Sequence, residues 1–334
     1  MKNNRKNIFL SLVIFLLISI YTCSPPDDDQ EPQGFPVNIP VFPYQGASFH
    51  ESLWLESIPG SIFVAEPLSH RIAKYSIQSN TYSSANDITF DTALYDNGTT
   101  MGWYASDVTG DIKGLDTPVD FAFTSNMIFI WILDNNGLTK RNFADGSIAV
   151  GPFDYTGSTI TECQNVLQIE YTNHLLALTK DAVGNFYICH FDEVASDFNL
   201  ADAILMTHPE TGRLVTNVPH FKANLNGIYI MQELELKHLS ETPVFFLEKR
   251  DGAFLFESGI FLYEASGLSF YTDQVVVSGR QRNYEGNITI LNANLDRISA
   301  YSLSVSPKLN GITHFDGFDL FINSFELYTD AVSQ

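Results

Sequence analysis

The chain contains few cysteines and few basic residues for its length. It has three Cys among 334 residues, and its 18 Lys and Arg stand against 39 Asp and Glu, which gives a formal net charge of −21. A surface this acidic repels phosphate backbones, so we expect no nucleic acid partner.

Sequence motifs for catalysis are also missing. There is no Gly-x-Ser-x-Gly motif and no glycine-rich phosphate loop, and the eight His lack the spacing of zinc ligands. Segments 107–111 and 134–137 resemble parts of calcium loops, but neither continues to a distal Glu. These absences favour a protein that is not an enzyme and carries no cofactor.

Long amphipathic helices are absent, and the composition favours strands. Aromatic residues make up 13% of the chain and charged residues only 17%. Aromatic and β-branched side chains pack well on pleated surfaces, whereas surface helices are rich in charge. We therefore predict an all-β protein with many short strands.

The segment 60–77 is the clearest copy of a repeated unit. Residues 62–65 form a short apolar run, 66–70 form a turn with Pro and Ser, and 72–77 alternate as a half-buried partner strand does. A single hairpin cannot bury its own apolar face, so it needs neighbours of the same kind. This need favours a β-propeller.

Six copies of the unit can be aligned along the chain. The paired strands are 52–55 with 62–65, 119–123 with 127–132, 166–170 with 175–178, 234–237 with 244–247, 268–271 with 275–277, and 312–315 with 320–322. One unit for every fifty or so residues is close to a propeller blade. We predict six blades, with five or seven as alternatives and a pair of β-sandwiches as the rival fold.

The first unit resembles an NHL-type propeller repeat. An apolar strand ends in Val64-Ala65-Glu66, and a polar turn is followed by Arg71-Ile72 and an aromatic residue, Tyr75. Glu66 replaces the usual Asp. The resemblance implies a propeller and no catalytic residue.

The two ends of the domain are expected to close the ring together. Residues 34–44 place Pro between Phe and Val, which suits an extended edge strand, and 318–323 form a candidate partner strand. Pairing of the first and last strands in one blade removes an exposed edge.

The N-terminus has the layout of a secretory signal. Lys2, Arg5 and Lys6 precede an apolar run at 8–20, and Cys23 follows. Residues 20–23 resemble the lipobox of bacterial lipoproteins, although Tyr21 and Thr22 replace the usual small residues. The resemblance implies lipidation of Cys23 and a membrane partner through the lipid. An ordinary signal peptide is the alternative.

We therefore divide the chain into a signal peptide (1–22), a disordered acidic tether (23–34) and a propeller domain (35–334). The tether places Ser and an Asp run beside the Cys. It resembles the signal that sends some lipoproteins to the outer face of the outer membrane, which implies an exposed outer-membrane lipoprotein.

Two cysteines remain after Cys23. Cys163 and Cys189 can form a disulfide in an oxidising compartment. Two separate buried thiols explain them equally well, since Cys189 lies within an apolar strand.

A few basic residues collect at one type of turn and suggest a binding rim. Arginine presents a planar fork to carboxylates, and an aromatic ring covers a sugar face, so the rim would suit an anionic or sugar-acid ligand. Charged turns that only keep edges soluble are the alternative. The rim candidates are Arg71, Trp103, Tyr104, Lys249, Arg250, Arg280, Arg282 and Tyr284.

These features favour a surface-anchored, non-catalytic binding or scaffold propeller. Its expected ligand is a glycan or a partner protein of the envelope. The alternative is a calcium-dependent enzyme of the lactonase, hydrolase or lyase type acting on a sugar-derived substrate. Some propeller enzymes hold calcium with carboxylates and amides from several blades, and Asp120, Asn165 and Asn310 fall at starts of inner strands.

Overall fold

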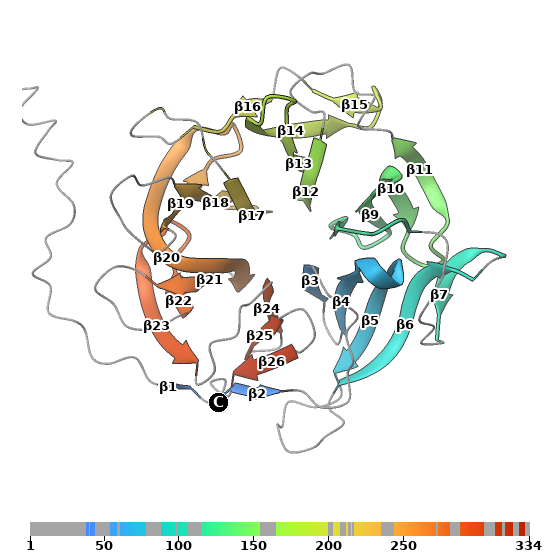
Figure 1. The fold of residues 1–334 in the computed structure, drawn as a ribbon, viewed down its shortest axis with the longest axis horizontal. Helices are drawn as coiled ribbons and strands as arrows, with labels where there is room; N and C mark the ends of the chain where they lie inside the picture. Colours follow the sequence, from blue (N-terminus) through green and yellow to red (C-terminus); the bar gives the residue numbers. More distant parts are fainter. Residues whose placement is uncertain are drawn as a thin grey trace, which may run out of the picture. The chain divides into compact units, whose positions relative to one another are not determined.

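A computed structural model shows a β-propeller. It describes residues 38–39, 41–43, 54–58, 61–77, 88–97, 99–105, 115–153, 165–199, 203–207, 212, 215, 217–234, 244–271, 273–280, 288–303, 311–315, 318–322 and 327–330. Residues 36–334 form one unit, whose five sheets follow one another around a ring (Figure 1). In the part of the chain that the structure describes, no helix has the length and apolar character needed to cross a membrane.

The first three sheets are antiparallel and follow the chain order. The first contains β3 (Trp54–Ile58), β4 (Ser61–Glu66), β5 (Arg71–Ile77), β6 (Ile88–Asp96) and β7 (Met101–Tyr104), with a 3-10 turn η1 (Pro67–Ser69) after β4. The second contains β8 (Asp120–Phe123), β9 (Phe129–Asp134), β10 (Gly137–Asn142) and β11 (Ile148–Phe153). The third contains β12 (Asn165–Tyr171), β13 (Leu175–Lys180), β14 (Phe186–Asp192), β15 (Asp197–Phe198) and β16 (Ile204–Leu205).

The hairpin expected at 60–77 is present as β4, η1 and β5. His70 ends η1 in the left-handed region, with a φ of 51°, and its backbone N–H donates to the Pro67 carbonyl. That hydrogen bond closes the turn, and the register then pairs Glu66 with Arg71. The local alternation of the sequence was sufficient to predict this unit.

The prediction of six blades is wrong, because two expected units share one eight-stranded sheet. This sheet contains β17 (Asn217–Asn224), β18 (Gly227–Leu234), β19 (Val244–Arg250), β20 (Phe256–Tyr271), β21 (Gln274–Arg280), β22 (Ile288–Leu291), β23 (Arg297–Leu303) and β1 (Asn38–Ile39). The 16-residue strand β20 pairs with β19 through its first half and with β21 through its second half. Its register shifts between Tyr263 and Gly267, where the two halves meet.

The two halves of this sheet pack against each other. Tyr229, Met231 and Leu247 of the first half share a buried cluster with Val275 and Val277 of the second. The sequence also misassigned the start of the first half. It paired 234–237 with 244–247, whereas β19 pairs with β18, and β17 is the first strand of this half.

The fifth sheet joins the two ends of the domain. It contains β24 (Gly311–Phe315), β25 (Phe318–Ile322), β26 (Leu327–Asp330) and β2 (Val41–Pro43). β2 pairs with β26 and not directly with the 318–322 strand, which lies next to β26. The 34–44 segment and the last strand therefore share a sheet through β2, as expected, with β26 as the partner strand, while β1 of the same segment pairs with β23 in the eight-stranded sheet.

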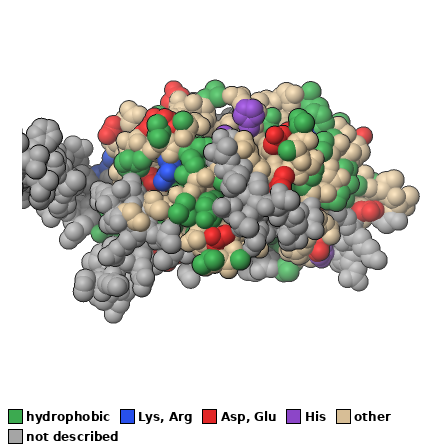
Figure 2. Space-filling model, turned by 90° about the horizontal axis from the view of Figure 1, so that it is seen from above, with side chains coloured by type: hydrophobic (Ala, Val, Ile, Leu, Met, Phe, Trp, Pro, Cys, Tyr) green, Lys and Arg blue, Asp and Glu red, His purple; other side chains and the backbone are tan. Residues whose placement is uncertain are grey.

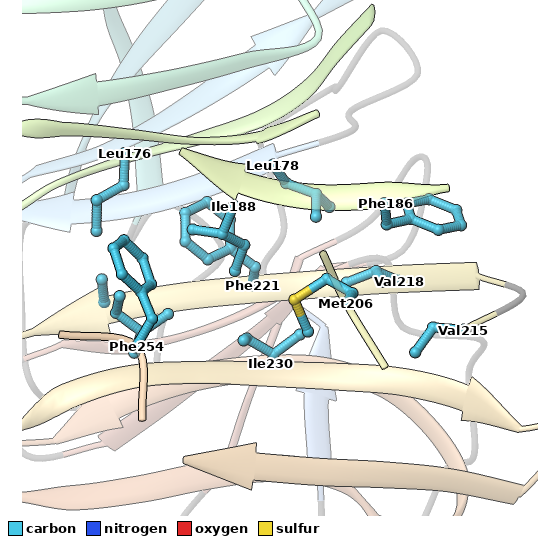
Figure 3. Close-up of a cluster of buried hydrophobic side chains, with 12 residues drawn as sticks. Leu176, Leu178, Phe186, Ile188, Met206, Val215, Val218, Phe221, Ile230 and Phe254 are labelled. Carbon is cyan, nitrogen blue, oxygen red and sulfur yellow. The ribbon is translucent and has the colours of Figure 1, made fainter. Parts of the chain in front are cut away.

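Apolar side chains fill the seams between neighbouring sheets. Leu176, Leu178 and Ile188 of the third sheet meet Phe221 and Ile230 of the next (Figure 3). Comparable clusters fill the seam between the first and second sheets and the seam between the second and third. Burial at about 25 cal/mol per Å² makes these seams the main source of stability.

Candidate functional site

Polar side chains of the innermost strands link one sheet to the next. Asp120 begins β8, and its Oδ2 accepts a 2.7 Å hydrogen bond from the backbone N–H of Ile169 on β12. Its Oδ1 accepts another, also 2.7 Å, from the N–H of Phe121. An innermost strand has one edge without a strand partner, so this carboxylate pairs a backbone group that would otherwise lack one.

Gln168 makes the same kind of link from β12 to β17. Its Nε2 donates to the Pro219 carbonyl at 2.6 Å, and its Oε1 accepts from the Phe221 N–H at 2.9 Å. The side-chain amide therefore makes the two hydrogen bonds that a neighbouring strand would make with the inner edge of β17. Pro219 fits this edge because it has no N–H to pair.

His220 continues the series from β17 to the second half of β20. Its Nε2 lies 2.7 Å from the carbonyl oxygen of Ser266. Burial lowers the pKa of His220 to about 4. The ring is therefore neutral at pH 7, and Nε2–H donates to the carbonyl.

Lys222 reaches beyond the neighbouring sheet. Its Nζ lies 2.9 Å from Oε1 of Glu170 on β12 and contacts Oε1 of Glu56 on β3, so one ammonium joins three sheets. The Lys222 side chain is 8% exposed, and that of Glu170 is 11% exposed. We call Glu56, Asp120, Gln168, Glu170, His220 and Lys222 the inner-strand network.

Burial shifts the pKa values of this network strongly. It raises the pKa of Asp120 and of Glu170 well above their usual values, and in Glu170 the nearby charge of Asp120 adds to the effect. Burial lowers the pKa of Lys222 to about 7. The carboxylates beside Lys222 oppose that shift, because an adjacent negative charge stabilises the ammonium.

Perturbed ionisable groups often mark catalytic sites, but structural ion pairs perturb them as well. Here the ammonium contacts two carboxylates, and Asp120, Gln168 and His220 bind backbone groups of the next inner strand. Among the described residues, no group of three or more His, Cys, Asp or Glu is placed to hold a metal ion. The arrangement can therefore join sheets, and its geometry offers no metal centre in the described part.

Three basic residues predicted for the rim lie inside the protein. Arg71 is fully buried, and its Nε donates to Glu66 Oε2 at 2.5 Å. Arg250 is 8% exposed and pairs with Glu248 at 2.6 Å, while Lys249 is 7% exposed and pairs with Glu257 at 2.6 Å. These residues do not form an exposed basic surface.

The two aromatic rim candidates lie half-buried on β7. Trp103 Nε1 donates to the Phe143 carbonyl at 2.7 Å, and its ring meets Phe63 edge-on. Tyr104 hydroxyl donates to the Thr100 carbonyl at 2.8 Å. The structure thus uses Trp103 in the seam between the first two sheets. Arg282 and Tyr284 lie outside the described residues, as does the side chain of Arg280.

The two described calcium candidates, Asp120 and Asn165, are not brought together. Asp120 meets β12 at Ile169, four residues beyond Asn165, a separation of about 13 Å along a strand. Asn165 is exposed and donates to the Lys180 carbonyl at 3.4 Å. Asn310 lies outside the described residues.

Of the three cysteines, the structure describes Cys189. Cys189 is buried on β14, and its sulfur lies 3.3 Å from Thr179 Oγ1. Cys163 and Cys23 lie outside the described residues. The disulfide and the lipidation therefore stay predictions.

Sequence reasoning missed most of the inner-strand network. Only Asp120 was singled out, and as a metal ligand. The available signal was a polar residue at every second position of otherwise apolar segments, as in Gln168 and Glu170 or His220 and Lys222. Such spacing places both side chains on one face of a strand.

No protein-family model matches the sequence, and no curated protein matches it, so the NHL resemblance gains no support. Similar solved structures include the extracellular domain of BT4673 from B. thetaiotaomicron (11% identity, 89% of this chain, TM-score 0.47) and U3-55K (8%, 90%, 0.48). Virginiamycin B lyase from Staphylococcus aureus is 10% identical over 87% of this chain, with a TM-score of 0.45.

The chain spans 40% of the BT4673 chain, 100% of U3-55K and 97% of the lyase. At this level of identity and structural similarity, the activities of these proteins are not transferred to this chain.

Proposed function

We propose that this protein is a non-catalytic binding or scaffold propeller, held at the outer-membrane surface by a lipid on Cys23. The observation that carries the non-catalytic part is the inner-strand network. Its charged side chains contact each other or the backbone of the next strand, so they serve the architecture.

A calcium-dependent reaction receives less support. Both carboxylate oxygens of Asp120 accept hydrogen bonds from backbone N–H groups. Asn165 lies at the start of β12, four residues before Ile169, the residue that Asp120 contacts. A metal at Asp120 would have to share carboxylate oxygens that each accept a short backbone hydrogen bond.

The anchoring part of the proposal rests on the signal-like N-terminus and the acidic tether. Replacement Cys23→Ala removes the only predicted lipidation site, and the tether has no other apolar anchor. We expect the signal-cleaved variant to leave the membrane fraction. Cell fractionation with immunoblotting measures this, and a variant that still needs detergent for release contradicts the anchor.

The binding part is tested with the full-length protein in detergent. One arm measures binding to immobilised glycans, and a second arm identifies envelope proteins crosslinked to the protein on intact cells. A reproducible ligand in either arm, unchanged by a calcium chelator, supports a binding propeller. Turnover of a lactone or glycan that stops when a chelator is added would contradict the binding propeller and support the calcium-dependent enzyme.

A further inference from the structure

Three turns at one end of the ring join an innermost strand to the next strand of its sheet, and a fourth turn at that end joins the second half of β20 to β21. They are 124–128 after β8, 172–174 after β12, 224–226 between β17 and β18, and residue 273 after β20. We call these turns the amide rim, because Asn residues recur in three of them.

Hydrogen bonds place the turns side by side. Ser125 Oγ donates to the Thr172 carbonyl at 2.8 Å, and Asn226 Nδ2 donates to Asp273 Oδ1 at 3.4 Å. Two of the inner strands beneath these turns are also connected, since Asp120 on β8 accepts a hydrogen bond from Ile169 on β12. The four turns therefore lie at the end of the ring towards which these strands run, while the matching turns of the first and fifth sheets lie outside the described residues.

The amide rim is almost free of charge. Among the residues of these four turns, Asp273 is the one with a charged side chain, although the whole chain carries a net charge of −21. Acidic side chains are spread over the side of the molecule seen in Figure 2. A polar but neutral rim in such an acidic protein would not repel an uncharged polar ligand, and it would not attract an anion.

Two rim amides, those of Asn126 and Asn224, are fixed in orientation before any ligand binds. Asn126 Oδ1 accepts from Thr124 Oγ1 at 2.8 Å and from the Ile128 N–H at 3.1 Å. Asn224 Oδ1 accepts from the Asn226 N–H at 2.8 Å. Holding the oxygen inside the turn directs the amide nitrogen outward, and a preorganised donor loses little entropy on binding.

The rim also offers apolar surface beside these donors. Leu225 is 87% exposed at the tip of its turn, and the His174 ring is exposed next to Asn173. Sugars present hydroxyls on their edges and C–H groups on their faces, so amides with an aliphatic or ring surface match both.

From this combination we infer that the amide rim binds a neutral carbohydrate. The inference rests on the proposed binding function and names its site and ligand class. It names a different surface from the predicted basic rim, of which Arg71, Lys249 and Arg250 are buried in ion pairs. The Arg280 and Arg282 part of that rim stays a prediction. The inner-strand network beneath the rim holds the turns in position.

The test uses the full-length protein in detergent with neutral hexasaccharides of glucose, mannose and xylose, and with hexagalacturonate as the acidic probe. The variants are Asn173→Ala and His174→Ala. The matched control is Asn135→Ala, an exposed Asn in the turn between β9 and β10, at the opposite end of the strands. We expect a neutral probe to bind, and each rim variant to lose affinity by at least about tenfold.

The control variant is expected to bind as the unmodified protein does, and all three variants keep its melting temperature because their side chains are exposed. Unchanged binding in both rim variants, or preference for hexagalacturonate, overturns the inference while leaving the binding function in place. Failure to bind any saccharide also overturns the inference. Crosslinking to an envelope protein on intact cells then tests the proposed binding function without reference to carbohydrate.

Discussion

The inner-strand network and the ion pair of β4 and β5 use the same side-chain types to connect different parts of the molecule. Lys222 joins β17 to β12 and β3, which belong to three sheets. Arg71 and Glu66 face each other within one hairpin. The first arrangement opposes separation of sheets, whereas the second stabilises a single sheet.

The largest expected effect comes from removing the ammonium at the centre of the network. Lys222→Met leaves Glu56 and Glu170 without their shared cation in a buried place, and breaking a buried ion pair costs about 3 to 5 kcal/mol. Urea denaturation measures the loss of unfolding free energy. The triple variant that also carries Glu56→Gln and Glu170→Gln is the control and should recover most of it. A loss below about 1 kcal/mol in Lys222→Met would contradict the role of this cation.

Because His220 is buried, we expect the contact between β17 and β20 to contribute less stability at low pH. Its folded pKa is about 4 against an unfolded value of 6.5, so the unfolded chain binds a proton first as the pH falls. Stability is therefore lost between pH 6.5 and 4, by about 3 kcal/mol from this group.

The measurement compares unfolding free energies at pH 7 and pH 4.5 for the unmodified protein and His220→Gln, which keeps a donor for Ser266. The variant is expected to lose less stability on acidification. His174→Gln, at an exposed position, serves as the control. Parallel pH profiles for the protein and His220→Gln would show that His220 does not carry this dependence.

The single-hairpin pair is expected to matter less than Lys222. In Arg71→Met, Glu66 keeps the Tyr75 hydroxyl, which donates to its Oε1 at 3.1 Å. We expect a loss of about 3 kcal/mol, at the low end of the cost of breaking a buried ion pair, since one carboxylate loses its cation instead of two and Tyr75 still donates to it. Thermal unfolding followed by circular dichroism measures it. A loss larger than that of Lys222→Met would reverse the comparison.

The smallest effect is expected at the half-exposed pair of Lys74 and Asp91. Their side chains are 28% and 37% exposed and meet at 2.5 Å across β5 and β6. Lys74→Ala should cost less than about 1 kcal/mol, and less still in high salt. Melting curves at two salt concentrations check this, and a larger, salt-independent loss would refute it.

The sequence predicted the parts of the fold that depend on neighbouring residues. The alternation at 60–77 identified β4 and β5, and the apolar run at 127–132 identified most of β9. The merging of two units could not be predicted, because it depends on which strands pair with each half of β20.

The innermost strand β17 was missed for a reason that concerns the network itself. Its segment contains Pro219, His220 and Lys222, which argue against a buried strand when read alone. In the structure these residues lie on an inner edge and meet partners on other sheets. Glu56 is 166 positions from Lys222, so no local pattern could have joined them.

The uninterrupted strand β20 has a mechanical consequence for the ring. Both of its halves are hydrogen-bonded to neighbours, and no loop separates them. The two parts of the eight-stranded sheet therefore have no flexible connection between them that would let them separate as rigid bodies. Under a pulling force, the ring is expected to part first at a seam between two separate sheets, where side-chain packing and polar links carry the load.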